Sequence, residues 1–151
     1  MEKFESIDHI LDFAMQSEQG AVDFYTKLAA NARSEDMKNI FEQYAKEEVG
    51  HKAKLAEIKA QGLLDLPKEK VADMKIADYV AYPDAGSDMN YEEALKVAMA
   101  REKAAFKLYS RLAESTDNAQ MKEIFQFLAQ EESKHKLRFE LEYDEFVLRE
   151  N

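Results

Sequence analysis

The chain has 151 residues, a formal net charge of −10 and no cysteine. It is long enough for one domain with a sizeable core, and its 34% charged residues with only 4 Gly and 2 Pro favour long helices over disorder or a turn-rich β fold. The acidity argues against nucleic acid or an anionic membrane as a partner, and the lack of cysteine excludes disulfides and thiolate-bound metal centres.

The first two predicted helices form a hairpin over residues 6–62. Apolar residues alternate at spacings of four and three over 7–28, and the same pattern returns over 37–58. A short turn separates the two segments, so the helices should be antiparallel. The expected boundaries are Ser6 and Ser34 as N-caps and Gly62 as a left-handed C-cap.

A connection of about 27 residues, 63–89, follows and contains both prolines and Gly86. A link of this length can cross the full length of a bundle, and we expect one short helical or extended piece near Lys70–Val80. The second hairpin, about 90–149, should begin at Asn90, which has Glu93 three residues later as in a capping box. Its second helix should start near Thr116–Asn118 and reach almost to Asn151.

The two hairpins are copies of one unit. Shifting the chain by 84 residues aligns 7–58 with 91–142 without a gap, and 17 of the 52 aligned pairs are identical. The pattern therefore predicts an all-α, antiparallel four-helix bundle that occupies the whole chain, 1–151, as a single domain.

Six polar residues occupy the apolar seam of this bundle: Glu18, Glu48, His51, Glu102, Glu132 and His135. Buried carboxylates without partners cost several kcal/mol each, and no Lys or Arg shares the seam. The four glutamates lie near the middle of their helices, so antiparallel packing should bring them to one level. A compensating positive charge must then come from outside the chain.

Two divalent cations meet this requirement, because they balance four carboxylates. Glu48 with His51 and Glu132 with His135 are both Glu-x-x-His, a spacing that points the two side chains of each pair the same way. One Glu from each of two helices plus Glu-x-x-His from each of the others is a known di-metal arrangement. Such a nitrogen and oxygen site suits iron or manganese better than copper.

This ligand pattern resembles the ferritin-like di-iron proteins, and it is most similar to the helical domain of rubrerythrins and to bacterioferritins. The resemblance implies that Glu48 and Glu132 bridge two iron ions while Glu18 and Glu102 bind terminally. The chain departs from rubrerythrins in having Ala105 where a further carboxylate is usual, and in lacking a rubredoxin iron centre. Val49 stands where bacterioferritins have a haem-ligating Met, so no haem is expected.

Four further residues can support the metal ligands. Tyr25 and Tyr109 lie on the same seam, seven residues after a ligand, and can hydrogen-bond the carboxylates. Glu47 and Glu131 can accept a hydrogen bond from the far histidines, Glu47 from His135 and Glu131 from His51. Solvated positions on a charged helix are the alternative for these two glutamates.

The expected function is that of an oxidoreductase that reduces H₂O₂, or O₂, with electrons from an external donor protein. The alternatives are a ferroxidase or iron-binding and storage protein, and a scaffold with a structural metal such as zinc. We expect a homodimer or higher homo-oligomer rather than a cage. The sequence shows no signal peptide and no apolar run of about 20 residues, so we expect a cytoplasmic protein without membrane contact.

Overall fold

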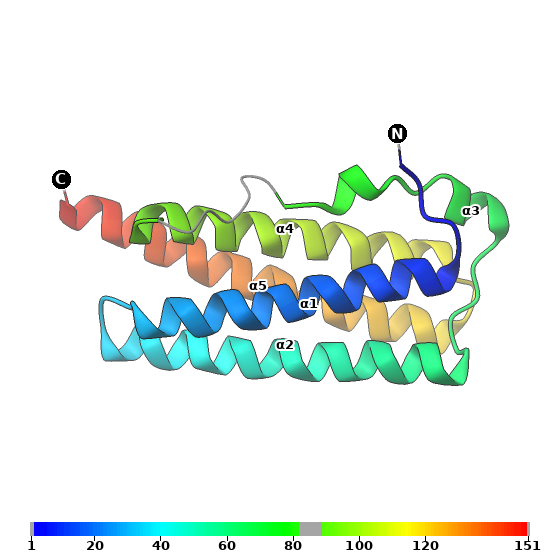
Figure 1. Ribbon diagram of the computed structural model, residues 1–151, viewed down its shortest axis with the longest axis horizontal. Coiled ribbons are helices and arrows are strands. Elements are labelled where there is room, and N and C mark those ends of the chain that lie inside the picture. Colours follow the sequence, from blue (N-terminus) through cyan, green and yellow to red (C-terminus); the bar gives the residue numbers. More distant parts are fainter. Residues whose placement is uncertain (1, 82–88, 151) are drawn as a thin grey trace.

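The computed structural model describes residues 2–81 and 89–150, with the side chain of Glu150 excepted. The described residues form helices and no named strand (Figure 1). Among them, none of the helices has the length and hydropathy needed to cross a bilayer. The elements in chain order are α1 (Ile7–Ala30), α2 (Glu35–Gln61), α3 (Lys68–Ala72), the 3-10 helix η1 (Ile76–Tyr79), α4 (Tyr91–Ser115) and α5 (Ala119–Glu150).

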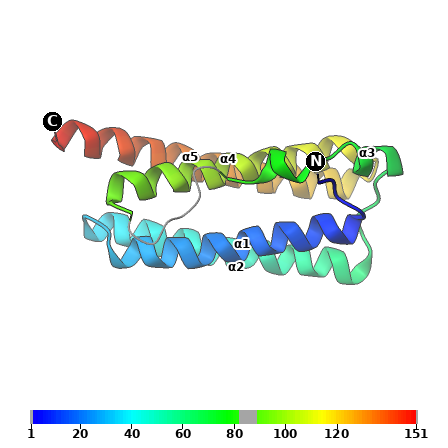
Figure 2. The same ribbon diagram turned by 45° about the horizontal axis from the view of Figure 1, so that its top comes forward.

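The four long helices form two antiparallel hairpins, α1 with α2 and α4 with α5. The hairpins lie one on the other, so that α1 is next to α4 while α2 is next to α5 (Figure 2). α2 ends at one end of the bundle and α4 begins at the other, and the described part of the connection contacts α4 through η1 (Figure 1). The predicted all-α four-helix bundle with a long crossover is confirmed.

The helix ends follow the local signals. The Ser6 and Ser34 hydroxyls accept hydrogen bonds from backbone N–H groups of the first turns of α1 and α2. Asn90 forms a complete capping box with Glu93 at the start of α4. Gly62 ends α2 with φ +60°, a left-handed conformation that a residue without Cβ adopts at little cost. These four predicted caps are confirmed.

The start of the last helix also agrees with its sequence signal. The Asn118 side chain accepts hydrogen bonds from the backbone N–H groups of Gln120 and Met121, so the helix begins directly after the predicted boundary. At its far end α5 continues to Glu150, as expected from a stretch without Gly or Pro. The long reach of the last helix is thus confirmed.

The crossover contains two short helical pieces, α3 and η1, where one piece was predicted near Lys70–Val80. It is held by the N-terminal segment, since Phe4 N donates to the Met74 carbonyl at 3.4 Å and Ile76 N donates to the Glu2 carbonyl at 3.2 Å. The Phe4 ring is buried and lies 6.2 Å from the Tyr79 ring. Residues 82–88, which include Pro83 and Gly86 of the predicted link, are outside the described part.

The core has two apolar clusters, one toward each end of the bundle. The cluster at the crossover end includes Leu11, Leu55, Leu108 and Phe125, and the other cluster includes Phe24, Phe41, Leu95 and Phe139. In every long helix the change from one cluster to the other falls at the glutamates of the seam. The packing thus leaves one polar layer at the middle of an apolar core.

Candidate metal centre

All six seam residues meet in this polar layer. The four glutamates, one from each long helix, are each 1% exposed, while His51 and His135 are 7% and 2% exposed. Antiparallel packing brings them to one level, since each glutamate follows the start of its apolar pattern by eleven residues. A spacing of three residues turns each histidine to the same side of its helix as its glutamate.

The first group of potential ligands surrounds His51. Its Nδ1 atom lies 3.0 Å from Glu132 Oε1, 3.3 Å from Glu48 Oε1 and 3.6 Å from Glu18 Oε2. Two ligand atoms that each lie about 2.1 Å from one ion are about 3.0–3.4 Å apart. The group therefore has the spacing of atoms that share a cation, and its four ligand atoms all lie within 4.8 Å of one another.

A second group consists of Glu48, Glu102 and His135. The Nδ1 atom of His135 lies 3.5 Å from Glu48 Oε1 and 3.6 Å from Glu102 Oε1. The same Glu48 oxygen is therefore close to both histidines, between the two groups. A carboxylate in this position can bridge two ions.

The hydrogen bonding of the layer tests whether a cation fits. Each of the six residues has at least one buried side-chain N or O atom without a hydrogen-bond partner among the described residues. Glu142 shows the opposite case, because this equally buried glutamate accepts hydrogen bonds from Arg33 at 2.7 and 2.8 Å and from the Tyr91 hydroxyl at 2.8 Å. Buried polar atoms are normally satisfied, so the unpartnered atoms of these six residues fit the ligands of a cation.

Two buried tyrosines connect the hairpins at this layer. The Tyr25 hydroxyl donates to Glu102, and the Tyr109 hydroxyl donates to Glu18. Each tyrosine thus bonds the glutamate of the opposite hairpin, as the repeat symmetry requires. Burial, together with the nearby carboxylates, raises the pKa of both phenols well above 10, so both remain donors at neutral pH. The predicted hydrogen bonds from these tyrosines to the carboxylates are confirmed.

The two glutamates that precede the bridging positions differ from each other. Glu47 Oε2 lies 3.6 Å from His135 Nε2, near the expected partner but beyond hydrogen-bond distance. Glu131 forms no contact with His51 among those of the described residues, and its carboxylate instead lies 3.5 Å from the Lys134 ammonium. The expected support of His51 by Glu131 is therefore not found, because Glu131 turns to a neighbour on its own helix.

The sequence analysis missed a contact of His135. The Tyr44 ring stacks on the imidazole at a centroid distance of 3.8 Å and an interplanar angle of 22°. The equivalent residue in the other half is Leu128, and it lies with His51 in an open groove between α2 and α5. One histidine is therefore covered by an aromatic ring, while its counterpart faces a groove. In the repeat alignment Tyr44 pairs with Leu128. This difference could have indicated from the sequence that His51 and His135 have different neighbours.

Without a cation the layer retains protons. Burial raises the pKa of Glu18 to about 8, and burial with the adjacent carboxylates raises that of Glu132 well above 4.5. Burial lowers the pKa of His51, but the neighbouring Glu18 and Glu48 outweigh it and raise the value to about 10. Four carboxylates this close cannot all be charged without positive charge beside them.

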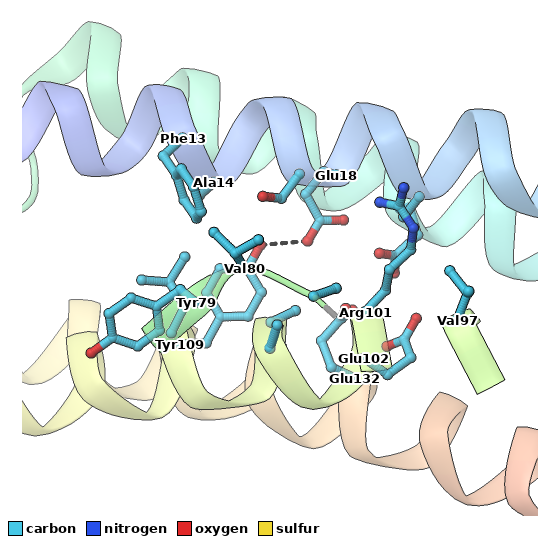
Figure 3. A pocket seen from close by; sticks show the side chains of 17 residues that line it. Phe13, Ala14, Glu18, Tyr79, Val80, Val97, Arg101, Glu102, Tyr109 and Glu132 are labelled. Atoms are coloured by element: carbon cyan, nitrogen blue, oxygen red, sulfur yellow. Dashed lines mark hydrogen bonds between the residues drawn. The ribbon is translucent and has the colours of Figure 1, made fainter. Parts of the chain in front are cut away.

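A cavity of about 190 Å³ opens beside the layer, between α1 and α4. All four glutamates line it, and Tyr79, Val80 and Ala81 of the crossover cover it (Figure 3). Small side chains, including Ala105, leave the space open. A molecule of a few atoms can therefore reach the carboxylates from this side.

Comparison with known structures agrees with the fold. A candidate ferritin-like diiron-carboxylate protein of Thermotoga maritima is similar with a TM-score of 0.76 and 20% sequence identity, over 96% of this chain and 99% of that one. A hypothetical protein of Pyrococcus furiosus is similar with a TM-score of 0.74 and 25% identity, over 93% of this chain and 89% of that one. No curated protein matches the sequence significantly. The fold is thus that of the ferritin-like class.

A comparison with family models also identifies the family within this class. The family model of rubrerythrin matches residues 9–143, which contain all six residues of the polar layer. The chain belongs to the rubrerythrin family.

Proposed function

We propose that this protein is a cytoplasmic di-iron oxidoreductase that reduces H₂O₂, or O₂, with electrons from a separate donor protein. The observation that carries the proposal is the polar layer, in which six buried residues each keep an unpartnered atom at the spacing of metal ligands. Family membership and the similarity to a diiron-carboxylate protein support iron as the metal. The chain is proposed to act as one domain, 1–151.

In this proposal each ion has one histidine and one terminal carboxylate. Glu18 and His51 would hold one ion, Glu102 and His135 the other, and Glu48 with Glu132 would bridge them. The position of the Glu48 oxygen near both histidines supports its bridging role. Four carboxylates carry −4 and two divalent ions carry +4, so the loaded layer would be neutral. Manganese or zinc would satisfy the same charge balance.

When bound, two ferrous ions would supply the two electrons that, with two protons, reduce H₂O₂ to two molecules of water. The residues of the polar layer would bind and orient the ions, and the two apolar clusters on either side of the layer exclude bulk water. Tyr25 and Tyr109 fix the terminal carboxylates through their hydroxyl groups. Besides the ligands, these hydroxyls are the side-chain acids of the described residues that contact the terminal carboxylates. The cavity between α1 and α4 would admit an oxidant of two atoms.

Two other functions are alternatives for the same residues. Ferroxidase or iron-storage activity would use the same ions with Fe²⁺ as the substrate. A structural metal such as zinc would give a scaffold without redox activity. The cavity that reaches all four glutamates favours a function with an exogenous small molecule over a closed structural site.

Anaerobic loading with Fe²⁺ followed by rapid mixing tests the proposal. We expect two irons per chain, and we expect H₂O₂ to oxidise them much faster than O₂ does, as followed by absorbance. Faster oxidation by O₂ with continued iron uptake beyond two would instead show a ferroxidase or storage protein. Zinc binding without any redox response would show a structural site.

Variants of the ligands provide the control. We expect Glu48→Ala and His135→Ala to lower the iron stoichiometry, because each removes a ligand from the buried layer. Glu57→Ala removes a carboxylate that is exposed on α2 and should leave two irons bound. Unchanged iron binding in both ligand variants would overturn the di-iron proposal.

A further inference from the structure

Among the described residues that line the cavity between α1 and α4, Arg101 is the one with a positively charged side chain. Arg101 precedes Glu102 on α4, lines the cavity and extends toward α1 (Figure 3). Its repeat equivalent on α1 is Ser17, which also lines the cavity. The residue directly before the glutamate of the polar layer is thus neutral in the first half of the repeat, Ser17, and positively charged in the second, Arg101.

The guanidinium is held at the cavity by α1. It lies over the Phe24 ring, 5.3 Å from the centroid, in a cation–π contact. A Cβ atom on Gly20 would lie only 3.0 Å from Nη1, so glycine at this position lets the guanidinium pack against the α1 backbone. The Nε atom is buried and has no hydrogen-bond partner among the described residues. The arginine therefore retains unused donor capacity at the cavity wall.

The charge of Arg101 matters because the metal-loaded layer would otherwise be neutral. Two divalent ions neutralise the four glutamates, and Arg101 then adds one positive charge beside them. A low-dielectric cavity strengthens the attraction between this charge and an anion. Ala105, on the next turn of α4, contributes only a methyl group, which leaves room beside the metal ligands.

We propose that the cavity between α1 and α4 is a binding site for one small monovalent anion of two or three heavy atoms, held by Arg101 beside the metal ions. The proposal rests on the di-iron function proposed above and names the class of its exogenous ligand. For peroxide reduction this class includes hydroperoxide, the conjugate base of H₂O₂. Arg101 is a positioning residue that attracts and orients the anion, and Ser17 is a second donor on the opposite wall.

Azide binding to the anaerobic, Fe²⁺-loaded protein tests this site, because two divalent ions leave the layer neutral and Arg101 as the excess charge. Azide is a monovalent anion of three atoms, and its affinity can be measured by calorimetric titration without turnover. We expect Arg101→Gln to weaken azide binding about tenfold, since it removes a charge from a partly buried site. Arg101→Lys keeps the charge and should lose less affinity. Lys103→Gln is the matched control, because it removes an exposed charge from the same helix and should change the affinity less than twofold.

Iron stoichiometry separates the failure of this site from the failure of the di-iron function. If two irons bind and azide affinity is the same in Arg101→Gln and wild type, or falls equally in Lys103→Gln, the anion site is wrong while the di-iron function stands. Loss of iron in Arg101→Gln would show a structural role and would also overturn the site. If wild type binds no iron, both proposals fail.

A second variant tests the space rather than the charge. Ala105→Val adds two methyl groups to the cavity wall and leaves the charge of Arg101 unchanged. We expect it to keep two irons and to weaken azide binding at least as much as Arg101→Gln does. Unchanged azide affinity in Ala105→Val would show that the anion binds elsewhere, and it would overturn the cavity as the site.

Discussion

The residues of the polar layer differ from other buried polar residues because each has a side-chain N or O atom without a hydrogen-bond partner among the described residues. Glu142 is as deeply buried as Glu18, yet Arg33 and Tyr91 satisfy its carboxylate. Glu18 receives one hydrogen bond from Tyr109, and its second oxygen has no partner among the described residues. Burial alone therefore does not mark a metal ligand. The glutamates of the polar layer combine burial with an unsatisfied carboxylate oxygen, and this combination supports their proposed role as metal ligands.

The tyrosines should contribute to metal affinity from outside the ligand set. We expect Tyr25→Phe and Tyr109→Phe each to weaken iron binding about tenfold, because each leaves a terminal carboxylate free to rotate. The repeat symmetry predicts effects of similar size. Competition with a chelator measures the affinity. Tyr143→Phe is the control, since the hydrogen-bond partner of its hydroxyl is Glu92, at 3.5 Å, a residue outside the polar layer. Wild-type affinity in both seam variants would contradict the role of these hydroxyls.

At the scale of helices, the ends are decided locally. Ser6, Ser34 and Asn90 each satisfy backbone N–H groups in the following turn, and Gly62 supplies the positive φ that stops α2. These interactions involve residues at most four apart. A sequence pattern is therefore sufficient to predict them, and the predicted caps agree with the structure.

Two glycines of α2 should respond in opposite ways to alanine. Gly62→Ala places a Cβ at φ +60°, and we expect it to lower the free energy of unfolding by about 1–2 kcal/mol. Gly50→Ala lies inside the helix with no atom within 4 Å of the new Cβ, and it should stabilise by about 0.5–1 kcal/mol. Urea unfolding of the metal-free protein measures both. Unchanged or increased stability in Gly62→Ala would show that the end of α2 does not depend on a left-handed residue.

For the whole molecule, the polar layer divides the core and links its folding to protons and metal. The pKa values of Glu18, Glu132, His51 and His135 are all raised in the folded, metal-free protein. Burial causes the shifts of the glutamates, and for the histidines the adjacent carboxylates outweigh the effect of burial. The folded protein therefore binds more protons than the unfolded chain above about pH 5. Metal binding would displace these protons.

The stability of the metal-free protein should fall as the pH rises. The unfolded chain loses its protons near pH 4.5 for Glu and 6.5 for His, whereas the folded protein keeps them up to about pH 8 at Glu18 and about pH 10 at His51. The free energy of unfolding must then decrease between about pH 5 and 9. Melting temperatures with a chelator present, at pH 5, 7 and 9, measure this decrease.

Two comparisons separate this effect from general charge repulsion in a chain of net charge −10. Glu18→Gln removes one titrating group from the layer, so it should reduce the slope of melting temperature against pH. Iron loading should raise the melting temperature most at high pH, where protons no longer compete for the ligands. A melting temperature of the metal-free protein that rises from pH 5 to 9 would contradict the raised pKa values.

The sequence by itself determined the four long helices, their caps and the six residues of the polar layer. Periodicity shows which side of a helix is buried, and charge on the buried side needs compensation. The gapless repeat also made the hairpins equivalent, which anticipated that Tyr25 and Tyr109 would have matching roles. These inferences depend on spacing within one helix or on symmetry, and both can be read from a linear chain.

Only the tertiary structure decided which residues meet across helices. It pairs each tyrosine with the glutamate of the opposite hairpin, stacks Tyr44 on His135 and turns Glu131 away from His51. It also brings the crossover over the cavity and Arg101 to the cavity wall. Such contacts depend on the rotation and separation of packed helices and on the path of a long loop. The spacing of residues along one chain does not specify these quantities.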